Sequence, residues 1–95
     1  MALTIIAQIA AHKGKEAFIK EELLKLIEPT KKEAGCLEYR LQEDNENPEK
    51  FIFVEKWENR ELWQAHMESE HLKNLVKVTE DALAGLVIHE MTEIG

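Results

Sequence analysis

The sequence contains a single cysteine, Cys36, among its 95 residues. One cysteine excludes an internal disulfide framework, and it also excludes zinc or iron–sulfur sites built from several cysteines. Positive charge is scarce as well, because twelve lysines and arginines stand against nineteen aspartates and glutamates, for a net charge of −7. Since phosphate-rich surfaces attract the opposite sign, we expect neither nucleic acid nor an anionic membrane as a partner.

Long apolar runs and common cofactor motifs are also missing. No stretch approaches the about 20 apolar residues that a membrane-spanning helix needs, and no basic segment precedes the apolar start as in a secretory signal. We therefore expect a cytoplasmic protein. The sequence has no phosphate-binding loop, no GxGxxG, no HExxH and no GxSxG. The expectation is that no cofactor is bound.

The length and the hydrophobic pattern predict one domain over residues 1–95. Short apolar or alternating runs indicate strands, and apolar residues at helical spacing indicate helices. Pro29 is expected to kink or restart the first helix, while Gly35 and Gly85 are expected to end the two long helices. The predicted series is a strand at Leu3–Ala11, a helix at Lys15–Glu33, strands at Cys36–Glu43 and Phe51–Trp57, a short helix after the predicted N-cap Asn59, a helix at Glu70–Ala84 after the predicted N-cap Ser69, and a strand at Leu86–Glu93.

This order is β-α-β-β-α-β, the ferredoxin-like arrangement of the α+β class. It predicts a four-stranded antiparallel sheet with the helices on one face. The strand faces that point away from the helices are also apolar, with Ile6, Ile52, Val54, Val87 and Met91. Because monomers rarely expose such a patch, the pattern predicts a homodimer in which two sheets pack face to face.

Two histidines, His66 and His71, are the first candidates for chemistry. Their spacing of five differs from the spacing of four that places metal ligands on one helix face. A helix break at Ser69 would nevertheless let them converge. They are either polar residues at a helix junction or an acid/base pair in a pocket, and we predict no metal site. His12 and His89 are expected to lie far from any site.

Glu55 is the second candidate, because it shares a strand face with Phe53 and Trp57. A carboxyl group buried among aromatic rings has a raised pKa and can act as a base. The alternative is a strand-end glutamate that pairs with Arg40 or reaches solvent. Tyr39, Phe53, Trp57 and Trp63 are candidates for substrate contacts, although packing in the core would explain each of them equally well.

An ordered set of segments resembles the antibiotic biosynthesis monooxygenase (ABM) domain family, and its small quinol monooxygenases in particular. The resemblance runs from Leu3 to about Ile94. The segments that carry it are Pro29-Thr30, Glu33-Ala34-Gly35-Cys36-Leu37-Glu38-Tyr39, Asp44, Asn47-Pro48, Phe51, Phe53-Val54-Glu55-Lys56-Trp57, Ala65-His66 and Ser69-Glu70-His71.

The resemblance implies a dimeric α/β barrel with a pocket between the sheet and the helices of each protomer. Trp57, His66 and His71 match positions that usually line this pocket. It also implies oxidation of a quinol or a polycyclic phenol by dioxygen. We favour His71 as the base, because a helix N-terminus keeps its ring neutral and able to accept a proton, with His66 or Glu55 as alternatives. Gln8 stands in the stretch where haem-degrading relatives carry asparagine, which argues against haem.

Two other functions fit the same family. One is isomerisation of a small phosphorylated carbonyl compound, which would need basic groups such as Arg40 or Arg60 at the mouth of the pocket. The other is binding of a small ligand by a dimer that has no catalytic activity.

Overall fold

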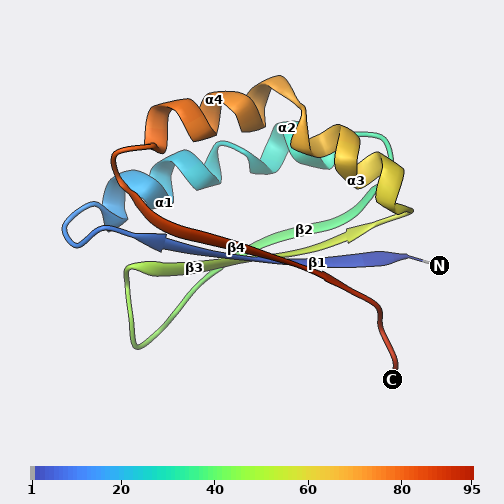
Figure 1. The fold of residues 1–95 in the computed structure, drawn as a ribbon, viewed down its shortest axis with the longest axis horizontal. Coiled ribbons are helices and arrows are strands. Elements are labelled where there is room, and N and C mark those ends of the chain that lie inside the picture. The colour runs from blue at the N-terminus through green and yellow to red at the C-terminus, as the bar shows by residue number, and fades with distance from the viewer. Residues whose placement is uncertain (1) are drawn as a thin grey trace.

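The computed structural model describes residues 2–95, in which eight elements follow one another (Figure 1). The sheet has the strand order β2-β3-β1-β4, and all three neighbouring pairs are antiparallel. The ferredoxin-like fold predicted from the sequence is confirmed, with each helical segment divided in two. The elements are β1 (Leu3–Ala11), α1 (Glu16–Leu24), α2 (Ile27–Lys31), β2 (Cys36–Glu43), β3 (Lys50–Trp57), α3 (Arg60–Met67), α4 (Glu70–Thr79) and β4 (Leu83–Met91).

The core lies between the sheet and the helices, which all cover the same face (Figure 1). The two central strands supply most of it, because every second side chain of β1 and β3 points toward the helices. Ala7 of β1 is opposite Phe53 of β3 in the register. Ile19, Leu23 and Leu26 from the first helical segment close this core from the other side.

The first helical segment is broken before Pro29 rather than at it. α1 ends at Leu24, and α2 begins at Ile27, so Pro29 is the third residue of the new helix. A proline in the first turn loses no helical hydrogen bond, because the N–H groups of that turn have no partner within the helix. The helix ends before Gly35, since α2 stops at Lys31 and its C-cap is Lys32, so the predicted helix stop at Gly35 is wrong. Gly35, with a φ of +84°, instead belongs to the turn that leads into β2.

The second helical segment begins at the two predicted caps. The Asn59 side chain accepts a hydrogen bond from the Leu62 N–H at 2.9 Å, and the Ser69 hydroxyl accepts one from Leu72. The predicted end of this segment is wrong. α4 stops at Thr79, and Gly85 lies within β4 opposite Ala10, at the point where a bulge shifts the pairing.

In the described residues 2–95, no helix covers the outer face of the sheet (Figure 1). Val87 and Met91 on the edge strand β4 are about half exposed there, at 51 % and 49 %. Ile6, Ile52 and Val54 on the central strands are partly exposed on the same face. Among residues 2–95, no helix combines the length and the apolar character that crossing a membrane requires.

Candidate functional site

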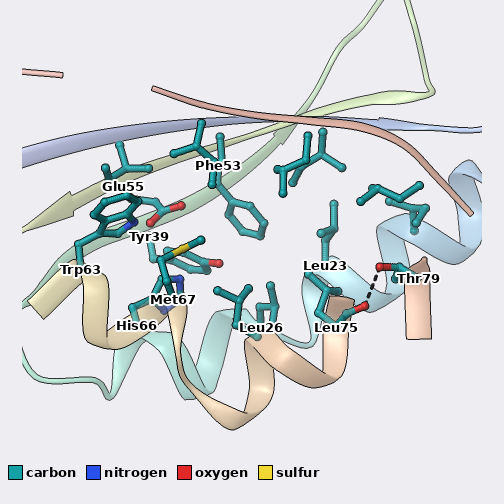
Figure 2. Close-up of a pocket in the computed structure, with 18 residues that line it drawn as sticks. Leu23, Leu26, Tyr39, Phe53, Glu55, Trp63, His66, Met67, Leu75 and Thr79 are labelled. Atoms are coloured by element: carbon teal, nitrogen blue, oxygen red, sulfur yellow. Dashed lines mark hydrogen bonds between the residues drawn. The ribbon is translucent and has the colours of Figure 1, made fainter. Parts of the chain in front are cut away.

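A cavity of about 80 Å³ lies between the inner face of the sheet and the helices. Most of its wall is aliphatic and aromatic, and the polar side chains on it come from Tyr39, Glu55, His66 and Thr79. Figure 2 shows Glu55, Tyr39 and His66 together at one end of the cavity, with Thr79 at the other end. The titratable groups are therefore concentrated against one part of an apolar space.

Glu55 reaches this end of the cavity from the middle of β3. Its neighbours across the sheet are Ile5 and Tyr39, and its side chain is only 4 % exposed. The Trp57 indole N–H donates a hydrogen bond of 2.9 Å to Glu55 Oε1. Burial raises the pKa of Glu55 to about 7, although this hydrogen bond opposes the shift. At neutral pH the group is divided between the acid and the carboxylate, so it can both accept and return a proton.

His66 approaches the same end from α3 and is almost completely buried. Its ring lies against Trp57, with 4.8 Å between ring centroids, and its Nδ1 is 2.7 Å from Glu33 Oε2. Burial lowers the pKa of His66, and the Glu33 carboxylate opposes that effect. Since a carboxylate accepts, the Nδ1 atom carries the donated proton, and in the neutral ring the Nε2 atom is left as an acceptor.

Tyr39 and Phe53 stack with ring centroids 4.5 Å apart, and both line the cavity. Burial raises the pKa of Tyr39 far above its ordinary value, and the Glu55 charge adds to this effect. The hydroxyl therefore stays protonated and is suited to donating a hydrogen bond. Trp63 also lines the cavity, next to Glu55 in Figure 2.

Two predicted residues do not line the cavity. Trp57 is fully buried behind Glu55 and His66, where it supplies a hydrogen bond and a packing surface. His71 lies in the first turn of α4 and turns toward Glu33, whose Oε2 atom is 2.7 Å from its Nε2. The expectation that His71 and Trp57 share the pocket wall is corrected, because the Ser69 cap starts α4 with His71 facing the α2–β2 connection.

Glu33 is the residue that the sequence did not single out. It lies between α2 and β2 and joins the two histidines through one oxygen atom. Its neighbours in sequence are lysines and an alanine, so no local pattern predicts a site residue at this position. The convergence of His66 and His71 that a break at Ser69 would allow does occur, and it takes place around this carboxylate.

Comparisons of the sequence and of the structure with known proteins lead to the same family. The family model for antibiotic biosynthesis monooxygenase (ABM) matches residues 2–78. An uncharacterized protein of Synechocystis sp. is 35 % identical over 69 residues, and the match covers 68 % of this chain and 47 % of that protein. The match thus spans about half the length of this relative.

Solved structures match this chain along nearly its whole length. The crystal structure of PA3566 from Pseudomonas aeruginosa has a TM-score of 0.95 and 30 % identity, over 99 % of this chain and 95 % of that one. A crystal structure described as an antibiotic biosynthesis monooxygenase has a TM-score of 0.90 and 26 % identity, over 98 % of this chain and 99 % of that one. With its fold and most of its sequence matched, the chain belongs to the antibiotic biosynthesis monooxygenase (ABM) family.

Proposed function

We propose that this protein is a cofactor-independent monooxygenase that oxidises a quinol with dioxygen. The observation that supports this proposal is the position of Glu55, a buried carboxyl group with a pKa near neutrality on the wall of an apolar cavity. The Tyr39 hydroxyl and the His66 ring lie at the same end of the cavity. A flat phenolic ring fits such surroundings, because aromatic side chains stack on it and a few polar groups orient it.

The substrate supplies the electrons in this reaction. Glu55 takes a phenolic proton, and the resulting phenolate is a better electron donor to dioxygen than the neutral quinol. One oxygen atom forms a bond to a ring carbon, and the other leaves as water after accepting two protons. A quinol and dioxygen thus give a hydroxyquinone and water, with all four electrons coming from the quinol. Tyr39 donates a hydrogen bond to the developing negative charge, which lowers the barrier.

The size of the cavity favours a single ring over a polycyclic phenol. An engineered protein cavity that binds benzene measures about 150 Å³, whereas this one measures about 80 Å³. Even one ring therefore requires some opening of the wall, and Met67 and Leu86 line the cavity while remaining partly exposed. We expect single-ring quinols to react faster than tricyclic phenols.

The two other functions have less support. An isomerase acting on a phosphorylated compound needs cationic groups, and the described part of the chain places no lysine or arginine on the wall of this cavity. Simple ligand binding without catalysis would leave the buried carboxyl group and its indole donor without a chemical role. The activity assay below distinguishes this last possibility from catalysis.

We also propose that two chains associate through the outer faces of their sheets. The proposal is supported by the apolar side chains on a face that carries no helix. Covering this face in a dimer removes it from water, which is the dominant favourable contribution to association of this kind.

The test is oxygen consumption by protein treated with a chelator, with a panel of one-, two- and three-ring quinols and phenols. We expect uptake without added flavin or metal. Glu55→Gln keeps the shape of the side chain but removes the proton acceptor, so turnover should fall by about 10²–10⁴-fold. Glu58→Gln, at an exposed glutamate that directly follows the same strand, is the matched control.

Binding of a quinol without oxygen uptake would favour the ligand-binding function and overturn the proposal. Full activity of Glu55→Gln would show that Glu55 is not the base and would point to His66. Dependence of the reaction on added flavin or metal would contradict the cofactor-independent mechanism.

A further inference from the structure

Three side chains with metal-ligating atoms meet beside the cavity, and one of them, His66, also lines its wall. Glu33 Oε2 is 2.7 Å from both His66 Nδ1 and His71 Nε2, and the three ligand atoms lie within 4.8 Å of one another. They come from three separate segments: the α2–β2 connection, α3 and the first turn of α4. We propose that Glu33, His66 and His71 form a binding site for a divalent transition-metal ion, with Zn²⁺ as the probe.

The set of donor atoms suits such an ion. Two imidazole nitrogens and one carboxylate oxygen are a common protein ligand set for zinc and for other first-row transition metals. Each histidine directs an N–H at the same carboxylate oxygen. When a dication binds these two nitrogens, each neutral ring carries its proton on its other nitrogen, and all three groups bind the ion.

Binding of an ion requires all three ligand atoms to move. Metal–ligand bonds of about 2.0–2.2 Å around a tetrahedral ion place neighbouring ligand atoms about 3.3 Å apart. The two contacts at 2.7 Å therefore widen by about 0.6 Å, while the two histidine nitrogens, which lie within 4.8 Å of each other, move to the same spacing. The Glu33 and His71 side chains are partly exposed, so their rotation can supply this adjustment.

The three ligands also differ in their exposure to solvent, and this difference suits the entry of an ion from one side. The side chains of His71 and Glu33 are 25 % and 18 % exposed, whereas that of His66 is 2 % exposed. The ion can therefore enter from solvent on the His71 side, and water can fill its remaining coordination position. His66 anchors the site from within the protein.

The local charge also favours a cation. The ion pairs of Glu33 in the described part of the chain involve only the two histidines, and Glu55 accepts its hydrogen bond from an uncharged indole. Within residues 2–95, neither carboxylate thus forms an ion pair with a lysine or an arginine. The net charge of −7 adds a general attraction for cations.

The experiment is equilibrium dialysis of chelator-treated protein against Zn²⁺, with thermal denaturation as a second measurement. We expect about one ion per chain and an increase in Tm with Zn²⁺ concentration, because a ligand that binds the native state stabilises it. His71→Asn and Glu33→Gln each remove a ligand at a partly exposed position. Each should weaken binding by more than about tenfold, since the loss of second-shell groups alone costs that much.

His12→Asn is the matched control, because His12 is exposed in the β1–α1 turn, and it should bind Zn²⁺ like the wild type. Circular dichroism verifies that each variant is folded. Wild-type binding no tighter than that of His71→Asn and Glu33→Gln would overturn the proposal. Binding is measured without substrate and the oxygen assay contains chelator, so the metal site and the oxygenase function are tested separately.

Discussion

At the scale of single residues, Glu55 connects stability with chemistry. The group lies among aromatic side chains, where its charged form loses the solvation that water provides. One hydrogen bond from Trp57 compensates for only part of this loss. The fold therefore keeps at this position a side chain that is less favourable when ionised, which is typical of groups retained for function.

The first prediction concerns pH and stability. The pKa of Glu55 is about 7 in the folded chain, compared with 4.5 for the free group. The unfolded chain therefore releases this proton at lower pH than the folded one. The contribution of this pKa difference to the free energy of unfolding is complete below about pH 4.5 and is lost as the pH rises to about 7. The loss amounts to about 3 kcal/mol.

Glu55→Gln removes this contribution. In urea denaturation, the stability of Glu55→Gln relative to the wild type should improve by about 3 kcal/mol between pH 4.5 and pH 8. Contributions of the histidines cancel in this comparison, because both proteins contain them. Glu58→Gln should follow the wild type at every pH, and a constant difference between Glu55→Gln and the wild type would contradict the prediction.

At the scale of elements, the α2–β2 connection determines the position of Glu33. Gly35 has a φ of +84°, and its carbonyl oxygen accepts a hydrogen bond from the Glu58 N–H at 2.9 Å. A side chain at this position would collide with Leu62 of α3. The tight turn thus brings the end of the first helical segment against α3, which carries His66.

The second prediction compares two glycines with similar backbone angles. Gly35→Ala forces alanine into a left-handed conformation and into contact with Leu62, so we expect a loss of stability of about 2–4 kcal/mol. Gly14 has a similar φ of +87° but open space around it. Gly14→Ala should therefore lower the free energy of unfolding by only about 1 kcal/mol. Chemical denaturation measures both. Equal losses would show that the contact with Leu62 contributes nothing.

At the scale of the whole molecule, the sheet has one covered and one uncovered face. Val54 is on the uncovered face, on a central strand between Ile6 and Arg40 of the neighbouring strands. Its position away from the edges makes it suitable for testing the proposed dimer, because a change there leaves the inner core and the cavity untouched.

The third prediction is that Val54→Asp converts a dimer into a monomer. An unpaired charge in an apolar interface costs several kcal/mol, on the order of a thousandfold in the dissociation constant. Sedimentation equilibrium at micromolar concentration should give about 22 kDa for the wild type, twice the chain mass of 11.0 kDa, and 11.0 kDa for the variant. Val76→Asp, at an exposed position of α4, should remain dimeric. A monomeric wild type would contradict the proposed association.

The class of fold and the inner faces of the central strands follow from the amino-acid pattern alone. Alternation in Phe51–Trp57 places Phe53, Glu55 and Trp57 on one face, and the structure confirms that this face is buried. The caps at Asn59 and Ser69 could likewise be predicted from the sequence, and their hydrogen bonds are present in the structure. These features depend on the periodicity of strands and on hydrogen bonds between near neighbours, which a linear pattern expresses directly.

Only the tertiary structure decided which polar groups meet. Glu33 is 33 residues from His66 and 38 from His71, and their contact depends on the turn at Gly35 and on the angle at which α4 follows α3. The same angle keeps His71 off the cavity wall and leaves Glu55 and His66 on it. Contacts of this range result from the packing of whole elements, and the side chains involved leave no periodic signal in the sequence.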